Sequence, residues 1–303
     1  MTRKLYFNQS NKYPFDLGKV LYAAQDFRWC KWDNEWHSGV LAGNLIHIRQ
    51  VDSVLEYKSH SGADLDVMLR SYFRLCDPID DIYDQLASRD SYIAQLVKKY
   101  HWLRVLRQPD SWECTVSYIC SATNNVDRIS GIVEKIAENF GGRLDLDGDV
   151  RFAFPTRRKV LRVGVGQFRE LSLGLDRHCK IITAAERIRD GQLNLSRAAR
   201  PEALYHKAKG QLTACYGIGN KVADCIALFG LDITEAFPVD VHIGRALAKR
   251  YGDCPMPENS STLSNRKYCE IVNWAQDRFG KYAGFANQFL FHEERENSQL
   301  MGR

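Results

Sequence analysis

The chain has 303 residues, 45% of them hydrophobic, and a formal net charge of +5, so it can bury a substantial core and divide into two or three domains. No run approaches the roughly 18 consecutive apolar residues of a membrane span, and the opening MTRKLYFNQSNKYPF has no apolar signal core, which argues against a membrane or secreted protein. The nine cysteines are scattered with no CxxC pair, as in an intracellular protein with reduced thiols, and those after residue 221 are too few for an iron–sulfur cluster.

Short strand-like runs fill residues 27–57. The runs FRWCKW, EWHSGVLA and LIHIRQ are rich in aromatic and β-branched residues. The pairs Asp33-Asn34 and Gly43-Asn44 fall between them, at places that suit tight hairpin turns. We predict a small antiparallel β-meander here.

Helical spacing of apolar residues begins after residue 60. The clearest helix is predicted at 126–140, with Gly141-Gly142 as its stop signal. The segment 143–160 has three aspartates but neither the spacing nor the terminal glutamate of a calcium-binding EF-hand loop, so we interpret it as a turn-forming loop. Helices predominate from residue 157 to the end.

Basic residues gather in one part of the second half of the chain. Residues 151–180 contain eight lysines and arginines against only Glu170 and Asp176. A surface of this charge suits a polyanion, although an ordinary solvated face would have the same composition. The charge distribution alone leaves both interpretations open.

Residues 212–230, LTACYGIGNKVADCIALFG, predict two helices joined by a tight Gly-Ile-Gly turn. Gly217 and Gly219 permit positive φ values and a close approach of another backbone. Unpaired N–H groups at the turn and at the start of the second helix form a cradle suited to phosphate. A generic helical hairpin without a ligand would show the same pattern.

Lys221 and Asp240 are the two chemically unusual residues of this region. Lys221 falls in the first turn of the second helix, where the helix dipole disfavours a cation, and Cys225 follows one turn later on the same face. Asp240 opens the next helix, and its simplest interpretation is an N-cap. His242 is equally compatible with a surface position.

The combination is more specific than its parts. A GIG hairpin, a lysine two residues on and a PVD nineteen residues after that lysine closely resemble the helix-hairpin-helix (HhH-GPD) DNA glycosylase superfamily. Within it, GIGNKVADCIALFGLDITEAFPVDVHI resembles the 8-oxoguanine DNA glycosylase/AP lyases. The motifs DFRW, ICSATNNVDRISG and YAGFANQFLF extend the resemblance over residues 15–292.

The resemblance implies an α+β fold. An N-terminal antiparallel β-sheet domain, TBP-like, is expected at residues 1–103, followed by an all-helical HhH-GPD body at 104–303. Two subdomains are expected within that body, one formed by residues 104–128 with 221–303 and the other by residues 129–220.

The resemblance also assigns roles around a flipped-out base. Lys221 matches the lysine that attacks the anomeric carbon and forms a Schiff base, which permits strand cleavage by β-elimination. Asp240 matches the carboxylate that stabilises oxocarbenium character. Cys225 and Phe291 match the two side chains that sandwich the base, and His242 matches a phosphate contact.

Further DNA contacts are implied on either side of the lesion. Arg128 and Arg177 match the arginines that read the cytosine opposite it, because a guanidinium fork suits the O2 and N3 acceptors of that base. The remaining matches to DNA-binding positions are Asn124, Asn125, Gly217 and Gly219.

Four positions depart from the family pattern. Ala24 stands where a glycine carbonyl senses the oxidised base, and Asn287, next to Gln288, stands where a glutamine reads the base edge. Thr123 replaces the first asparagine of the SATNN motif. Leu175 or Asp176 stands where the family has a tyrosine wedge. These departures bear on which lesion is recognised rather than on the chemistry.

The expected partner is double-stranded DNA that contains an oxidised purine, bound by a monomer located in the cytoplasm or nucleoid, or in the nucleus of a eukaryote. We expect no metal, iron–sulfur cluster or other cofactor, apart from a structural monovalent cation that the hairpin backbone could hold. Two alternatives stay open: a glycosylase of this superfamily for a different purine lesion, and a non-catalytic DNA-binding module.

Overall fold

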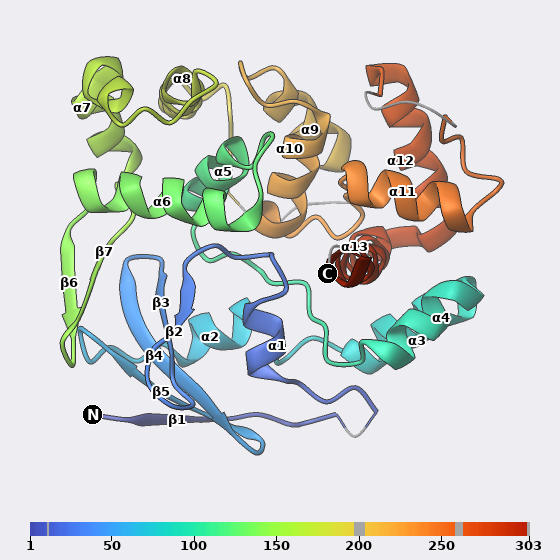
Figure 1. Ribbon diagram of the computed structural model, residues 1–303, viewed down its shortest axis with the longest axis horizontal. Coiled ribbons are helices and arrows are strands. Elements are labelled where there is room, and N and C mark those ends of the chain that lie inside the picture. Colours follow the sequence, from blue (N-terminus) through green and yellow to red (C-terminus); the bar gives the residue numbers. More distant parts are fainter. Residues whose placement is uncertain (11, 197–203, 258–262, 302–303) are drawn as a thin grey trace.

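The computed structural model, which describes residues 1–10, 12–196, 204–257 and 263–301, begins with a five-stranded antiparallel sheet (Figure 1). The strands lie in the order β1-β5-β4-β3-β2. Their bounds are β1 (Arg3–Tyr6), β2 (Trp29–Lys31), β3 (His37–Leu41), β4 (Asn44–Val51) and β5 (Val54–Ser59). The predicted meander is confirmed. β1 was not predicted, because it is short and its pairing with β5, which places Leu5 opposite Leu55, is remote in sequence.

Both predicted hairpin turns are present, one of them shifted. Asn34 lies between β2 and β3 with a φ of 45°. The next turn is at Ala42 and Gly43, with φ values of 46° and 77°, and Asn44 already begins β4. The left-handed conformation at both central residues is what a two-residue type I′ turn requires. The predicted pair Gly43-Asn44 was therefore one residue late.

One helix lies between the first two strands in sequence, and the others follow the sheet. Their bounds are α1 (Leu17–Leu21), between β1 and β2, α2 (Asp66–Tyr72), α3 (Ile79–Arg89), α4 (Ser91–Lys99), α5 (Ser111–Cys120) and α6 (Val126–Phe140). α6 coincides with the helix predicted at 126–140. Its buried face includes Ile129, Val133 and Ile136, as its apolar spacing indicates.

The structure of residues 143–152 contradicts two predictions: a loop at this place, and a body made only of helices. These residues form a second sheet of two strands, β6 (Arg143–Leu146) and β7 (Asp149–Phe152), joined by a turn at Asp147 and Gly148 with φ values of 52° and 85°. The pair Asp147-Gly148, between runs of alternating polar and apolar residues, is a hairpin signal. Leu144 packs against Val40 and Leu45 of the first sheet, so this hairpin belongs structurally to the β-rich part.

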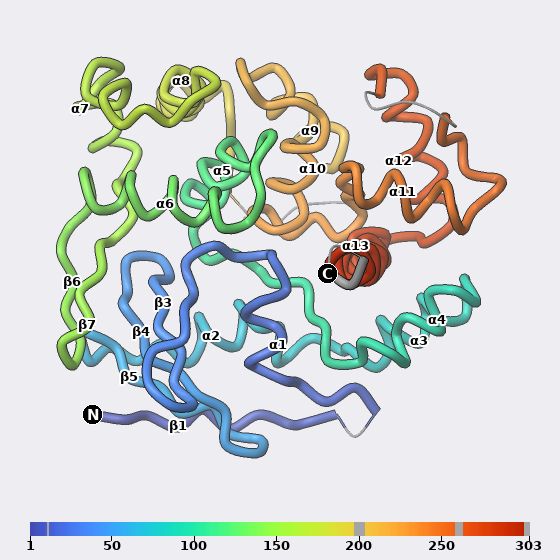
Figure 2. The backbone as a smooth tube through the Cα atoms, viewed as in Figure 1, coloured from blue at the N-terminus to red at the C-terminus, as the bar shows by residue number. Residues whose placement is uncertain are grey.

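The rest of the described chain is helical. The elements are α7 (Arg157–Glu170), α8 (Arg177–Arg189), α9 (Leu204–Thr213), α10 (Asn220–Cys225), the π-helical turn η1 (Ile226–Gly230), α11 (Val241–Arg250), α12 (Asn265–Phe279), the 3₁₀ turn η2 (Gly280–Tyr282) and α13 (Ala283–Met301). α13 contacts both α4 and α11, and Figure 2 shows it near the centre of the view.

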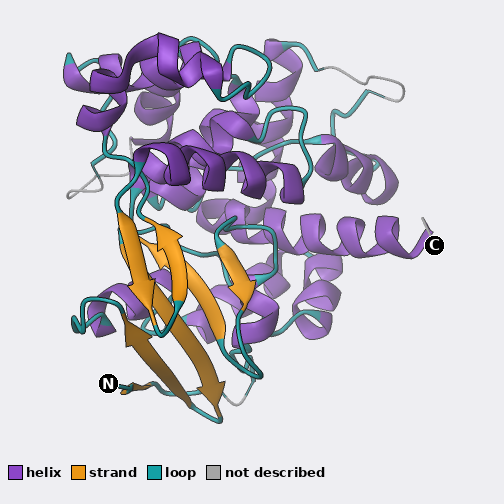
Figure 3. Ribbon diagram, turned by 60° about the vertical axis from the view of Figure 1, so that its left-hand side comes forward, coloured by secondary structure: helices purple, strands orange, loops and turns teal. Residues whose placement is uncertain are grey.

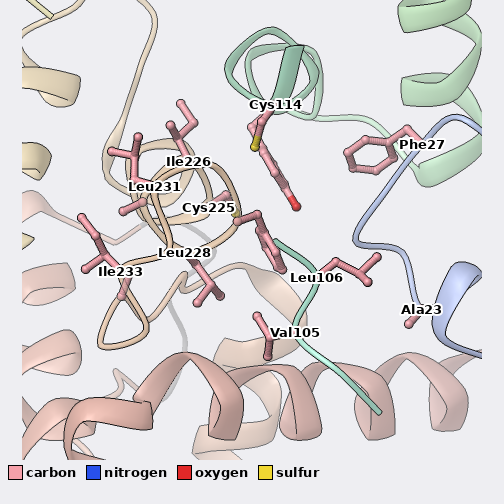
Figure 4. Packing of buried hydrophobic residues seen from close by; sticks show 14 of the residues in the cluster. Ala23, Phe27, Val105, Leu106, Cys114, Cys225, Ile226, Leu228, Leu231 and Ile233 are labelled. Atoms are coloured by element: carbon pink, nitrogen blue, oxygen red, sulfur yellow. The ribbon is translucent and has the colours of Figure 1, made fainter. Parts of the chain in front are cut away.

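One apolar cluster connects the sheet with the helices. Figure 3 shows the strands grouped on one side of the helical region. Figure 4 shows buried residues of this cluster from three separate parts of the chain: Ala23 and Phe27, Val105 and Leu106, and the segment from Cys225 to Ile233. The division at residues 103 and 104, and the two subdomains within the body, stay predictions. Within the described residues, no helix is long and apolar enough to cross a bilayer.

Candidate functional site

The Gly-Ile-Gly turn joins α9 to α10, as predicted. Gly217 has a φ of 85°, and a Cβ at this position would lie 2.2 Å from Cγ of Lys180. Backbone conformation and packing therefore both require glycine there. Gly219 is different, because it precedes α10 with a φ of −81° and a Cβ would meet no atom within 4 Å.

Lys221 lies in the first turn of α10, where the sequence placed it. Its Nζ donates a hydrogen bond to Oγ of Ser121 at 3.3 Å and lies 5.7 Å from the centroid of the Tyr118 ring. Both partners come from the end of α5 and the residue after it. Among the described residues, Nζ of Lys221 is thus held beside a hydroxyl and an aromatic ring rather than in an ion pair.

Asp240 is the N-cap of α11. Its Oδ1 accepts the N–H of Ile243 at 2.9 Å, which satisfies one of the free donors at the start of that helix. The N-cap interpretation is therefore confirmed. It does not exclude a second role, because this bond engages one carboxylate oxygen and Asp240 is only partly buried.

A cavity of about 390 Å³ brings the predicted residues together. Its size lies within the range of about 300–1,000 Å³ that is common for ligand pockets. The predicted residues in its lining are Ala24, Asn124, Asn125, Lys221, Cys225, Asp240, His242, Asn287 and Phe291. They come from the N-terminal part, the start of α6, α10, α11 and α13, so only the tertiary fold assembles them.

The apolar walls of the cavity include Cys225 and Phe291. Burial raises the pKa of the Cys225 thiol to about 11, so the thiol is protonated and uncharged at neutral pH. The ring of Phe291 meets the His242 imidazole edge to face, with centroids 5.6 Å apart. Nδ1 of His242 is buried and has no hydrogen-bond partner within the described residues.

The amide of Asn287 is already engaged. Its Nδ2 donates to the carbonyl of Pro238 at 2.8 Å, and its Oδ1 accepts from Nε2 of Gln288 at 3.0 Å. Asn287 therefore supports the chain just before Asp240. Gln288 also lines the cavity, and it is longer by one methylene.

Two departures from the family pattern coincide with unusual backbone. Ala24 has a φ of 61° and Thr123 a φ of 57°. The left-handed region disfavours side chains with a Cβ and β-branched ones most of all. Glycine and asparagine, the residues that the family pattern has at these two positions, tolerate that conformation.

The predicted base contact by Arg177 does not fit its position. Only 2% of Arg177 is exposed, its Nη1 donates to the carbonyl of Leu173 at 2.7 Å, and its Nη2 donates to that of Ala122 at 2.5 Å. Arg177 thus fastens the loop before α8 to the loop after α5. Arg128 is exposed at the start of α6 and outside the cavity lining. Leu175 and Asp176, the two candidates for the wedge, are both exposed.

Comparisons with known proteins agree with this arrangement. Residues 7–115 match the family model of the N-terminal domain of 8-oxoguanine DNA glycosylase. An N-glycosylase/DNA lyase of Saccharomyces cerevisiae is 29% identical over 94% of this chain and 84% of its own length. One from Arabidopsis thaliana is 29% identical over 89% of this chain and 74% of its own.

A solved structure covers nearly the whole molecule. The 8-oxoguanine glycosylase/lyase of Clostridium acetobutylicum, in complex with double-stranded DNA that contains cytosine opposite 8-oxoguanine, superposes with a TM-score of 0.81. The match has 28% identity and covers 94% of this chain and 93% of that one. Over nearly its whole length, the chain is similar to 8-oxoguanine DNA glycosylase/lyases.

The chain has the predicted α+β fold. The cavity also includes residues that sequence reasoning missed. Tyr118 and Ser121 contact the lysine, and Arg295, Ser298 and Gln299 contribute from the later turns of α13. A spacing of three residues on one helix could have singled out Tyr118 and Ser121. Nothing in the local sequence indicates that the far end of α13 reaches the site.

Proposed function

We propose that the protein is a bifunctional DNA glycosylase/AP lyase that flips 8-oxoguanine out of duplex DNA, excises it and nicks the strand. The observation that carries this proposal is that an amine, Lys221, and a carboxylate, Asp240, line one cavity with apolar walls. A phosphate-binding hairpin alone would need neither group, which argues against a non-catalytic DNA-binding module.

Lys221 is the nucleophile in this proposal. As a neutral amine it attacks the anomeric carbon while the bond from that carbon to the base breaks, and the bonding electrons leave with the base, which takes up a proton. Opening of the sugar ring converts the new carbon–nitrogen bond into a Schiff base. Loss of a proton from the adjacent carbon then expels the 3′ phosphate by β-elimination. The hydrogen bond from Nζ of Lys221 to Oγ of Ser121 at 3.3 Å supports this role, because it holds the amine at the cavity that Asp240 also lines.

Asp240 stabilises the positive charge that develops on the sugar when the base leaves. A fixed carboxylate in a site shielded from water does this more effectively than solvent. Because Oδ1 is held by the N–H of Ile243 at 2.9 Å, the carboxylate is oriented before the substrate enters.

The excised base is held between Cys225 and Phe291. A protonated thiol, which the raised pKa of about 11 ensures at neutral pH, offers a polarisable surface without a charge. The aromatic ring of Phe291 supplies a stacking face of the kind that flipped bases use. Gln288, whose Nε2 donates to Oδ1 of Asn287 at 3.0 Å, also lines the cavity and is the second amide that can read the base edge.

We propose cytosine as the preferred opposite base, read by Arg128. The DNA in the Clostridium acetobutylicum complex contains this pair, and an exposed guanidinium suits the acceptors of cytosine. With Arg177 buried, only one of the two predicted arginines supports this preference. We therefore expect weaker discrimination between opposite bases than a pair of arginines would provide.

A different purine lesion is the second candidate substrate. Ala24 adds a methyl group where the family pattern has glycine, and the Asn287 amide is bonded to Pro238 at 2.8 Å. Both features alter the part of the cavity that would contact the lesion. Excision of another oxidised or alkylated purine faster than 8-oxoguanine would favour this candidate.

Borohydride trapping tests the proposal directly. Duplexes with 8-oxoguanine opposite each of the four bases are incubated with the protein and reduced, which fixes any Schiff base as a covalent adduct. We expect an adduct with the wild type, strongest opposite cytosine, and none with Lys221→Gln. If no lesion duplex produces an adduct, the lyase mechanism is wrong.

The remaining expectations become proposals of the same kind. The protein acts as a monomer on DNA inside the cell, where its nine cysteines would stay reduced. The amine and the carboxylate suffice for the reaction, so we propose that it needs no divalent metal or organic cofactor and continues in EDTA. A monovalent cation at the hairpin backbone would be structural, and replacing potassium with a bulky organic cation tests for it.

A further inference from the structure

A buried carboxylate follows Lys221 on the same helix. Asp224 is fully buried, and three donors meet its two oxygens. The Tyr205 hydroxyl donates to Oδ1 at 2.8 Å, while Nζ of Lys209 and the Tyr268 hydroxyl donate to Oδ2 at 2.8 and 2.7 Å. None of these groups takes part in the chemistry proposed above. A buried ion pair is seldom needed for stability alone, because apolar residues of similar volume often serve as well.

Tyr268 extends this cluster to the second catalytic residue. Its hydroxyl donates to Asp224 and also accepts the backbone N–H of Val239 at 3.0 Å. Val239 directly precedes Asp240. Tyr268 comes from α12 and does not line the cavity. A hydroxyl that donates one bond and accepts another is fixed in rotation, so the two contacts depend on each other.

The short segment before α11 is therefore held at three consecutive residues. The carbonyl of Pro238 accepts from Asn287 at 2.8 Å, the N–H of Val239 donates to Tyr268 at 3.0 Å, and Oδ1 of Asp240 accepts from Ile243 at 2.9 Å. Of these three anchors, only the Tyr268 contact leads, through Asp224, to the helix that carries Lys221.

We infer that Asp224 and Tyr268 form a bridge that sets the position of the Asp240 carboxylate relative to Lys221. This inference rests on the proposed function and makes Tyr268 a positioning residue for base excision. Sub-ångström displacement of a catalytic group is enough to slow a reaction strongly, since proximity and orientation contribute a large share of catalysis.

The chain offers a matched pair of variants to test the bridge. Tyr268→Phe and Tyr205→Phe each remove one hydroxyl that donates to Asp224, and both tyrosines are buried. The two differ in what the hydroxyl accepts, which is the Val239 N–H for Tyr268 and Nζ of Lys209, at 2.8 Å, for Tyr205. Of the two, only Tyr268→Phe removes an anchor of the segment that carries Asp240.

The full-length variants are compared in single-turnover excision from a duplex with 8-oxoguanine opposite cytosine, below the melting temperature of each. We expect Tyr268→Phe to slow excision by about 10- to 100-fold and Tyr205→Phe to keep the wild-type rate. Cleavage of a preformed abasic site, which requires Lys221 but no departing base, should stay near the wild-type rate in both. A merely structural defect would lower both activities together.

Hydrogen exchange of the Val239 amide supplies a readout that does not depend on activity. We expect faster exchange in Tyr268→Phe than in Tyr205→Phe or the wild type. Equal excision rates in the two variants, or equal exchange, would overturn the bridge. Failure of the wild type to excise any lesion would instead overturn the proposed function, and the exchange measurement would still decide whether the bridge exists.

Discussion

Replacing Asp240 with asparagine separates its two roles. In the wild type, Oδ1 accepts the Ile243 N–H at 2.9 Å, and the carboxylate also carries the charge that the proposed reaction needs. Asparagine keeps an oxygen of the same size and remains a good N-cap. Asp240→Ala removes the cap and the charge together, so comparison of the two variants assigns each effect.

The expected magnitudes differ enough to be measured apart. Asp240→Asn loses the interaction of a negative charge with the helix N-terminus, about 0.3–1 kcal/mol, and keeps the hydrogen bond. Asp240→Ala also loses the cap, typically about 1 kcal/mol more. Loss of one preorganised electrostatic group from an active site costs about 2.7–4 kcal/mol of transition-state stabilisation, or a rate factor of about 10²–10³. Both variants should therefore lose excision similarly while differing in stability.

Single-turnover excision, urea unfolding and DNA binding are measured on the same preparations. Ser264→Ala is the control for cap loss, because Ser264 caps α12 through the N–H of Lys267 at 3.2 Å and does not line the cavity. It should be destabilised by about 1 kcal/mol and excise at the wild-type rate.

Unchanged excision by Asp240→Asn would refute the catalytic role and leave Asp240 as a helix cap. If Ser264→Ala slowed excision as much as Asp240→Ala, cap loss rather than charge loss would explain the effect. DNA affinity should change little in all three variants, since none of the substitutions removes a positive charge.

Three further predictions concern the site and its supports. Gly217→Ala should destabilise the fold by at least about 1 kcal/mol, because it combines a positive φ with a 2.2 Å approach to Lys180. Gly219→Ala meets no atom within 4 Å and loses only a favoured N-cap residue, so it should destabilise less in urea unfolding. Equal effects of the two substitutions would contradict the reasoning. Thr123→Asn should stabilise by about 0.5–1 kcal/mol, because asparagine tolerates the φ of 57° better than a β-branched residue; a lower urea midpoint would count against strain at this position. Burial raises the pKa of Cys225 to about 11, so the folded state holds the thiol proton that the unfolded chain releases near pH 9. The free energy of unfolding should therefore decrease between pH 9 and 11. Cys225→Ala should make this decrease smaller, and an identical pH profile would show that Cys225 does not cause it.

Local patterns were enough for several features. The strand runs between residues 27 and 57, helix α6, the Gly-Ile-Gly turn and the N-cap at Asp240 all follow from residue types at short spacing. The two elements that were not predicted, the hairpin at 143–152 and strand β1, show the limit of such short patterns. The hairpin at 143–152 differs from the predicted loop, because its two strands have only four residues each, too few for a clear strand pattern, although Asp147-Gly148 is a turn signal. β1 depends on a partner remote in sequence, which no short window contains.

By itself, the sequence determined which chemistry is proposed for the protein, because Lys221, Asp240 and the Gly-Ile-Gly hairpin form a short, characteristic pattern. Only the tertiary structure decided which side chains reach the cavity. It buries Arg177 against two carbonyls, engages Asn287 with Pro238, and brings Tyr268 from α12 to the Val239 N–H. These outcomes depend on contacts between helices that are remote in sequence. Burial and hydrogen-bond partners at such contacts are set by packing, which local residue patterns do not encode.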